Sequence, residues 1–183
     1  KRRHIHKATV RDRLLHHAVY RILYPFFDRT FIADSYSCRN DKGMHKAIYR
    51  FRALANQVSR NYTRTCWVLK CDIRKFFASI DHRILLSILK EYIPDQDIIW
   101  LLENIIESFR IVIPTVRLGG EGSLKYGKGI SPFRFASVEM TETTQIGLPL
   151  GNLTSQLFAN VYMNKFDQWV KHSLKAKHYI RYA

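Results

Sequence analysis

A single aspartate near the middle of the chain stands in a setting that suits metal-dependent phosphoryl transfer. The segment 66–73 (CWVLKCDI) has the β-branched and aromatic content of a strand, and Asp72 would leave the sheet at its C-terminal end. Arg74 and Lys75 follow in a turn whose backbone N–H groups would suit a triphosphate. Nucleotidyl transfer by two metal ions needs carboxylates on neighbouring strand ends, so Asp72 is a candidate catalytic metal ligand. Taken alone, such an aspartate is more often a surface cap or turn residue.

Two adjacent aromatic residues follow the basic pair. Phe76 and Phe77 cannot both face one core layer of a strand, so one ring is free to pack against a bound sugar. Burial of both rings across a bend is an equally good interpretation of this feature alone.

A second segment, 147–156 (GLPLGNLTSQ), predicts a tight turn followed by the start of a helix. Small and polar residues open that helix, which would leave its first N–H groups uncapped at the positive end of the helix dipole. Phosphate or nucleobase contact would use both features. An ordinary helix capped by Asn152 is the alternative, and this segment alone favours it.

The charge of the chain predicts a polyanionic partner. Of its 183 residues, 46% are hydrophobic, enough for a globular core, and the formal net charge is +15. Residues 1–75 hold 18 basic and 5 acidic side chains, whereas residues 76–183 hold 12 and 10. Aromatic residues make up 13% and no apolar run approaches membrane-spanning length, so nucleic acid is favoured over a membrane. Three cysteines without CxxC spacing indicate a reduced, cytoplasmic protein.

Apolar residues at helical spacing predict two helices in the first third of the chain. The first covers 12–27, with Asp12 at its start and Pro25 marking its end; its expected inward stripe is Leu14, Leu15, Ala18, Val19, Ile22, Leu23 and Phe26. The second has an apolar face of Met44, Ala47, Ile48, Phe51, Leu54, Ala55 and Val58, and a basic face of Lys46, Arg50, Arg52 and Arg60. That basic face is equally consistent with simple solvation.

Three more helices and a hairpin are expected further along. Asp81 would cap a helix that buries Ile84, Leu85, Ile88 and Leu89, and a second helix would cover 97–109. Glycines gather between Gly119 and Gly129, so 110–146 predicts a β-hairpin or mobile loop. A helix over 153–174, with Leu157, Val161, Tyr162, Phe166, Trp169 and Val170 inward, and a strand over 178–183 complete the chain.

Five segments resemble reverse transcriptases and occur in that family's order. They are RHIHKATVRDR, SYSCRNDKG, CDIRKFFASIDH, GLPLGNLTSQLFAN and YIRYA. The resemblance implies an α/β (α+β) fold, with the fingers of a right-hand polymerase at 1–66 and 87–146 and part of the palm at 67–86 and 147–183. Ser155–Gln156 and the stretch around Cys38 are more similar to diversity-generating retroelement enzymes than to group II intron proteins.

The resemblance also assigns residues to the nucleotide. Asp72 would be the first metal-binding aspartate, with the Ile73 carbonyl as a further ligand, and Phe77 would be the gate that excludes a ribose 2′-hydroxyl. The other expected nucleotide contacts are Arg3, Lys7, Arg74, Lys75, Phe76, Leu150 and Gly151. Leu150 stands where many relatives have glutamine, which predicts reduced fidelity.

Template contacts are expected at Arg13, Arg39, Ser155, Gln156 and Tyr182. Arg13 and Arg39 would help to place the triphosphate or the template, Ser155 would line the template–nucleotide pocket together with Gly151, and Tyr182 would belong to the family's Tyr-x-Asp-Asp turn. The chain stops at Ala183, where two catalytic aspartates should follow. We therefore expect an inactive fragment that is truncated before this turn and lacks the thumb.

The parent protein implied by the resemblance copies RNA into DNA with two Mg²⁺ ions. Its expected partners are an RNA template, a DNA primer, deoxynucleoside triphosphates and an accessory protein of the retroelement, with no membrane. A group II intron or defence-associated reverse transcriptase is the alternative in the same class. A noncatalytic basic RNA-binding module, in which Asp72 has no catalytic role, is the alternative of another class.

Overall fold

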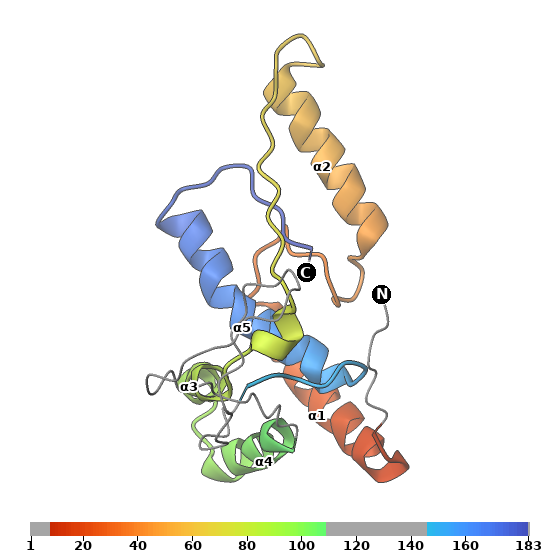
Figure 1. Cartoon of the computed structure of the whole chain (residues 1–183), viewed down its shortest axis with the longest axis vertical. Coiled ribbons are helices and arrows are strands. Elements are labelled where there is room, and N and C mark those ends of the chain that lie inside the picture. Colours follow the sequence, from red (N-terminus) through yellow and green to blue (C-terminus); the bar gives the residue numbers. More distant parts are fainter. Residues whose placement is uncertain (1–7, 109–145, 183) are drawn as a thin grey trace, which may run out of the picture.

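The computed structural model describes residues 8–108 and 146–182, and this part of the chain is mostly helical (Figure 1). Its elements are α1 (Val10–Asp28), α2 (Met44–Ser59), the 3-10 helix η1 (Phe76–Ser79), α3 (His82–Tyr92), α4 (Gln96–Glu107) and α5 (Leu153–His172). Arg3, Lys7 and the predicted hairpin at 110–146, except Ile146, lie outside the described residues.

Helix α5 organises the core. It packs against α1 and α3, and α3 packs in turn against α4, whereas α2 stands above these four helices in Figure 1. The most deeply buried apolar side chains come from all four packed helices and include Phe27, Leu85, Leu89, Leu102, Ile106, Leu157 and Phe158. Burial of these side chains fixes the position of α5, whose first turn carries the predicted template residues.

Helix α1 starts earlier and ends later than predicted. Thr9 is the N-cap: its hydroxyl accepts from the Asp12 N–H and donates to the Asp12 carboxylate at 2.7 Å. Pro25 lies inside the helix, although a proline removes one helical hydrogen bond. The carbonyl left without that bond belongs to exposed Arg21, where water can bond it, and Phe27 is buried, which favours the last turn.

The predicted apolar faces of α1 and α2 are only partly buried. Val19, Leu23, Tyr24 and Phe27 are the buried residues of α1, whereas Leu14, Ile22 and Phe26 are exposed. In α2 the apolar residues Ala47 and Leu54 are buried, and Met44, Ile48, Phe51 and Val58 are exposed. Periodicity identified the helices correctly, but the neighbours that pack against each one decide how much of the apolar face is covered.

The remaining helices agree more closely with their predictions. Asp81 caps α3 by accepting from the backbone N–H groups of Arg83 and Ile84, and Asp95 caps α4 in the same way. Ile84 is nevertheless exposed. Leu157, Val161 and Val170 of α5 are buried as expected, but the Phe166 and Trp169 rings are about half exposed and lie 6.0 Å apart on the surface.

The predicted strand at 66–73 is wrong for this structure. Residues 65–73 form no strand pairing among the described residues, and Trp67 and Leu69 are 92% and 90% exposed. The predicted strand at 178–183 is likewise reduced to a single parallel bridge between Arg181 and Ser35. A strand needs a neighbour to bond with, so composition alone does not produce one. The sheet implied by the α/β (α+β) class is therefore not formed in the described residues.

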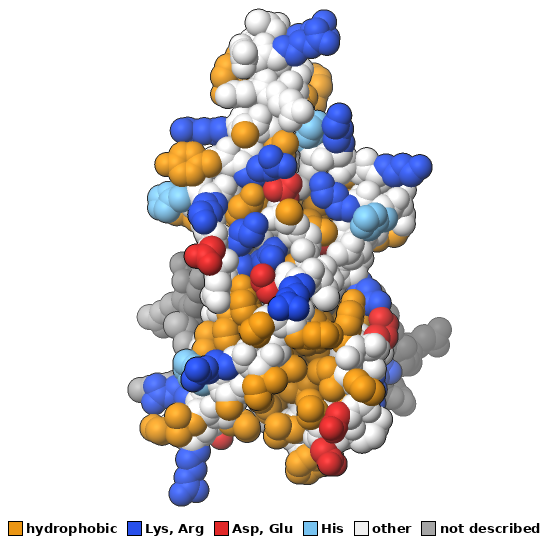
Figure 2. All heavy atoms as spheres, turned by 180° about the vertical axis from the view of Figure 1, so that it is seen from behind, with side chains coloured by type: hydrophobic (Ala, Val, Ile, Leu, Met, Phe, Trp, Pro, Cys, Tyr) orange, Lys and Arg blue, Asp and Glu red, His pale blue; other side chains and the backbone are white. Residues whose placement is uncertain are grey.

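Charge is distributed unevenly over the surface. Figure 2 shows many Lys and Arg side chains over the upper half of the molecule, where Figure 1 places α2, and a broad apolar surface over the lower half. The described helices include none that is both long and apolar enough to cross a lipid bilayer.

Candidate functional site

Two of the segments that the sequence singles out lie directly against each other. The Leu148 N–H donates to the Phe77 carbonyl at 2.7 Å, and the Gly147 N–H donates to the Ile80 carbonyl at 2.8 Å. Ile146 and Asp81 add an antiparallel bridge. Gly147 has φ = 97°, a conformation that residues with a β-carbon rarely adopt. The turn that leads into α5 is therefore fixed to the segment that follows Asp72.

A buried histidine strengthens this junction. The His82 side chain is fully buried, and its Nε2 lies 2.6 Å from the Gly147 carbonyl oxygen. Its Nδ1 has no hydrogen-bond partner among the described residues. Sequence analysis missed His82, because a lone histidine in the first turn of a helix carries no pattern; the only signal was its place in the CDIRKFFASIDH segment.

Asp72 and the two residues that follow it are exposed. The Asp72 carboxylate and the Ile73 backbone lie in the extended segment before η1, with Arg74 next to them. Lys75 is exposed as well and has φ = 52°, so the chain turns sharply there. Carboxylate and carbonyl oxygens are the donors that Mg²⁺ prefers, and an exposed Asp72 leaves its oxygens available.

A complete metal site is not assembled in the described part of the chain. No group of three or more His, Cys, Asp or Glu residues that could hold a metal ion is present there. Asp72 and Ile73 thus supply oxygen donors of the right type but too few of them for a site of their own.

The Phe76 and Phe77 rings both pack against the core; neither ring lies wholly in solvent. The Phe76 and Phe77 rings meet edge to face, with centroids 5.6 Å apart, and both are partly buried against the hydrophobic core. This is the burial across a bend that the sequence left open. Each ring still has an exposed part, so contact with a bound sugar remains geometrically available to either one.

The first turn of α5 has no side-chain cap, although the segment alone favoured a helix capped by Asn152. Asn152 occupies the N-cap position but makes no capping hydrogen bond through its side chain. Gly151 is exposed with φ = 114°, Leu150 is partly buried and Ser155 is only 2% exposed. Gln156 is partly buried. Of the predicted residues in this segment, Gly151 is thus the most accessible to a ligand and Ser155 the least.

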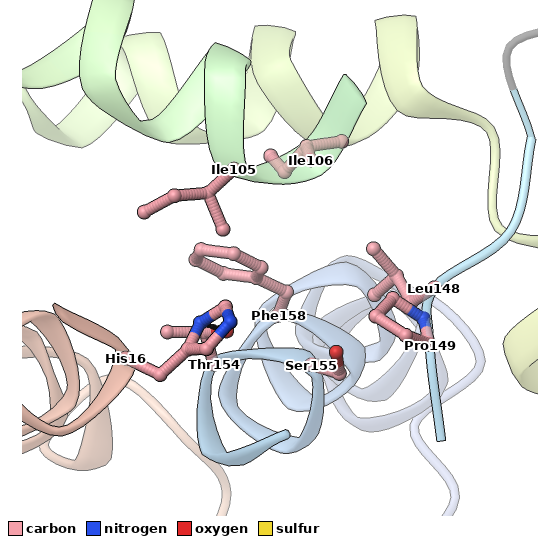
Figure 3. A pocket seen from close by; sticks show the side chains of 8 residues that line it. All are labelled: His16, Ile105, Ile106, Leu148, Pro149, Thr154, Ser155 and Phe158. Carbon is pink, nitrogen blue, oxygen red and sulfur yellow. Dashed lines mark hydrogen bonds between the residues drawn. The ribbon is translucent and has the colours of Figure 1, made fainter. Parts of the chain in front are cut away.

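A hydrogen bond to α1 helps to hold the first turn of α5 in place (Figure 3). The Thr154 hydroxyl and His16 Nδ1 are 2.8 Å apart, although the residues are separated by 138 positions. Burial lowers the pKa of His16, as does His17 to a smaller degree, while Asp12 acts in the opposite direction. His16 and Thr154 flank a cavity of about 10 Å³, enough for at most one water molecule, whose wall includes Leu148, Pro149 and Phe158.

A larger cleft lies next to this cavity but away from the predicted residues. It has a volume of about 440 Å³ and lies between α1, α4 and the turn before α5, with His16, Ile105 and Pro149 in its wall. None of the residues assigned to metal, nucleotide or template lines it. The predicted site residues therefore lie outside this cleft, and Asp72 and Gly151 are both exposed.

Arg13 and Arg39 differ in accessibility. Arg13 is exposed in the first turns of α1. The Arg39 side chain is only 6% exposed: its Nε donates to the Asp28 carboxylate at 2.7 Å, and its terminal nitrogens donate to the carbonyls of Asp28, Ile32 and Ser35. Burial alone would raise the pKa of Asp28, but hydrogen bonds from Arg39 and Tyr24 hold it below its usual value. The Arg39 guanidinium is therefore occupied in holding its own loop, which leaves little of it open to a ligand.

The C-terminal segment comes close to the Asp72 segment. Burial is the main cause of a raised pKa at Tyr179, its hydrogen bond to Asp167 is the next, and the neighbouring Cys71 thiol adds a smaller effect. Cys71 directly precedes Asp72, so this part of the C-terminal segment lies near the start of the Asp72 segment. Tyr182 is 57% exposed near the end of this segment.

Comparison with known proteins identifies the family of this chain. The chain is 24% identical over 88% of its length to protein YkfC of Escherichia coli (strain K12), of which it covers 35%. It is 24% identical over 88% of its length to group II intron-encoded protein LtrA of Lactococcus lactis subsp. cremoris, of which it covers 22%. A match to nuclear intron maturase 1, mitochondrial, of Arabidopsis thaliana is 25% identical over 51% of the chain and covers 12% of that protein.

The chain thus spans about a third or less of the length of each of these relatives. The family described as reverse transcriptase (RNA-dependent DNA polymerase) matches residues 1–183, so the chain belongs to the reverse transcriptase family.

Proposed function

We propose that the protein containing this chain is an RNA-directed DNA polymerase, and that this chain forms its fingers and part of its palm. The observation that carries the proposal is the junction between two distant motifs. Hydrogen bonds from Gly147 and Leu148 hold the turn before α5 against the segment that follows Asp72. One carboxylate, a basic turn and an open helix start are thereby brought to one region, as transfer of a nucleotide onto a primer requires.

In this proposal the palm comprises 67–86 and 147–183, and the fingers comprise 1–66 and 87–146. Asp72 and the Ile73 carbonyl would hold Mg²⁺ together with carboxylates from outside the described residues. When bound, the cation supplies charge neutralisation at the transferring phosphoryl group. Because Asp72 is exposed, its oxygens can reach a ligand without any change in the packed helices.

The chain's own residues would bind and orient the nucleotide. Arg74 and Lys75 are exposed beside Asp72, and their positive charges suit a triphosphate. Phe76 and Phe77 are held by the core on one side and would present an edge to the sugar. Arg3 and Lys7 remain proposed triphosphate contacts from outside the described residues.

The template would be read from the start of α5. Gly151 is the exposed position there, Leu150 lies before it, and Ser155 and Gln156 form the turn that follows. The Asn152 side chain does not cap the start of α5, so the N–H groups there would bond a backbone phosphate or a base. Arg13 and Tyr182 would add exposed contacts to the template, and Arg39 would position its loop.

We assign the protein to the diversity-generating retroelement type because of Ser155–Gln156, the stretch around Cys38 and the leucine at position 150. The similarity to group II intron-encoded protein LtrA favours the neighbouring alternative, an intron-encoded enzyme. Proposed partners are an RNA template, a DNA primer, deoxynucleoside triphosphates and an accessory protein. We place the protein in the cytoplasm, where its three free cysteines would stay reduced.

The test is DNA synthesis by the longer protein on a defined RNA template with an annealed DNA primer and Mg²⁺. We expect deoxynucleotides to be added in the order that the template dictates, and chelation of the metal to stop the reaction. The competing function, a noncatalytic RNA-binding module, predicts tight RNA binding with no extension of the primer. That result with intact, correctly folded protein would overturn the proposal.

A further inference from the structure

A buried ion pair anchors the last described residues of the chain to α5. Arg181 is 5% exposed and Asp167 is fully buried, and the Arg181 Nε donates to both carboxylate oxygens, at 3.0 and 2.8 Å. Two charges removed from water are tolerated only when they are paired with good geometry and their remaining donors are satisfied. Asp167 lies in the middle of a long helix, where the sequence alone indicates a solvated carboxylate.

A second nitrogen of the Arg181 side chain is engaged as well. Its Nη2 donates to the Ser35 hydroxyl at 2.8 Å and to the Asn160 side-chain oxygen at 3.0 Å. The backbone of the same residue is bonded on both sides: the Arg181 N–H donates to the Asp34 carbonyl, and its carbonyl accepts from the Tyr36 N–H, both at 3.0 Å. One residue thus joins the C-terminal segment to α5 and to the loop 34–37.

Further contacts extend this network to α2. Asp34 accepts two hydrogen bonds from Arg50 of α2, at 2.9 and 3.1 Å, and a third from the Tyr36 hydroxyl at 3.1 Å. On the other side, the Tyr179 hydroxyl donates to Asp167 at 2.7 Å. The segment before Tyr182 is therefore tied through directional bonds to α5, to the loop 34–37 and, through Asp34, to α2.

The hydrogen bonds of Arg181 select one register of the C-terminal segment, which apolar packing would not do. An apolar residue at position 181 would fill the same space, but it would not distinguish one register of the segment from the next. A planar guanidinium with four side-chain acceptor atoms around it fits in one orientation only. The backbone directly before Tyr182 is therefore fixed, although more than half of the area of Tyr182 itself is exposed.

We propose that Arg181 is a positioning residue: paired with Asp167 and bonded to Ser35 and Asn160, it fixes Tyr182 and the segment beside Asp72 relative to the start of α5. The inference rests on the proposed function, since it assigns Tyr182 to the polymerase site. It adds that the loop 34–37, together with Arg50 of α2, helps to set the geometry of this site from a distance.

The decisive variant is Ser35→Ala in the longer protein, because it removes one hydroxyl from the network and leaves the ion pair in place. We expect kcat for RNA-templated primer extension to fall by about 10- to 100-fold, since a misplacement of about 1 Å far from the chemistry can cost about 100-fold. KM for the deoxynucleotide should change much less. Arg181→Lys, which keeps the charge but loses the planar fork, should lower kcat further.

Two control variants separate positioning from general destabilisation. Lys165→Gln breaks the exposed ion pair between Lys165 of α5 and Glu91 of α3, and Ile106→Val removes one methylene from the core within α4. Both should keep wild-type kcat at temperatures where the proteins are folded. If Ser35→Ala and Arg181→Lys behave like these controls, the positioning role is overturned.

Amide hydrogen exchange in this chain tests the positioning separately from activity. The Tyr36 and Arg181 N–H groups should be protected in the wild type and should exchange at least about tenfold faster in Ser35→Ala, because local opening becomes easier. Unchanged protection would overturn the inference. An inactive wild-type protein that shows the expected exchange pattern would instead contradict the proposed function and leave the anchoring of Tyr182 established.

Discussion

At the scale of single residues, Phe77 provides the sharpest prediction about nucleotide choice. Its backbone carbonyl accepts the bond from Leu148, so a change of side chain leaves the junction between the motifs in place. Phe77→Val in the longer protein should raise incorporation of ribonucleotides relative to deoxyribonucleotides by roughly tenfold or more, a typical effect of removing bulk from a pocket wall.

The matched control for this experiment is the adjacent ring. Phe76→Val removes the same volume from the same edge-to-face pair and should leave the ribonucleotide ratio near that of the wild type. Single-nucleotide incorporation assays with each substrate measure both ratios. If only Phe76→Val changes the ratio, the gate belongs to Phe76 instead.

Leu150 provides a second prediction at this scale. The side chain lies partly buried in the turn before α5 and can offer only contact area, whereas glutamine would offer a donor and an acceptor to the nascent base pair. Leu150→Gln should therefore lower misincorporation by up to about tenfold, the value of one polar group left unpaired by wrong geometry. Sequencing of cDNA made on one template measures this, and identical error spectra would mean that Leu150 only packs.

The candidate site was predictable from sequence only where the residues carry a local pattern. Asp72, the Phe76–Phe77 pair and the turn before α5 each stand in a recognisable context. Asp167 does not, because it has the sequence context of a solvated charge, and although Arg181 lies in the YIRYA segment, nothing there indicates that its charge is buried. Only the folded chain brings them together.

At the scale of helices and turns, the contact between His16 of α1 and Thr154 of α5 predicts a pH effect. Burial holds the pKa of His16 below its ordinary value of 6.5, so the histidine is neutral in the folded chain at a pH where the unfolded chain already binds a proton. The contribution to stability is therefore complete above about 6.5 and is lost as the pH falls through the lower folded value.

This effect can be measured by thermal denaturation of the chain between about pH 5 and about pH 8. His16→Gln should remove part of the stability loss on acidification and leave the remainder, which other groups cause. His17→Gln is the control, since His17 is the exposed neighbour on the same helix and affects the pKa of His16 only weakly. A steeper loss of stability in His16→Gln than in the wild type would refute the assignment.

The helices were predictable and the strands were not, for a physical reason. A helix bonds within one segment, so the spacing of Leu15, Val19 and Leu23 is enough to predict α1. The segment 66–73 has the composition of a strand, but its hydrogen bonds must go to a neighbour that local sequence does not specify. Ile22 and Phe26 were expected to be buried but are exposed, because local sequence does not specify the neighbours of a helix either. Periodicity identifies the apolar face of α1, and the neighbouring helices decide how much of that face is buried.

At the scale of the whole molecule, the basic surface predicts salt-dependent binding of RNA. The formal charge of residues 1–75 exceeds that of the rest, and many of those side chains are exposed around α2. If five phosphates of a single strand are neutralised, log K should fall against log salt with a slope of about −3.5, at about 0.7 per phosphate. Fluorescence anisotropy with labelled RNA at several salt concentrations measures the slope, and binding that is indifferent to salt would contradict the prediction.

The central claim is that Asp72 is a catalytic carboxylate of a polymerase, and RNA-templated primer extension by the longer protein with Mg²⁺ tests it most directly. Asp72→Asn should abolish extension and leave circular dichroism and thermal stability unchanged, because the side chain is exposed and the amide has nearly the same shape. Asp97→Asn, at an exposed aspartate in the first turn of α4, should extend the primer as the wild type does. An Asp72→Asn protein that extends the primer at the wild-type rate would contradict the account.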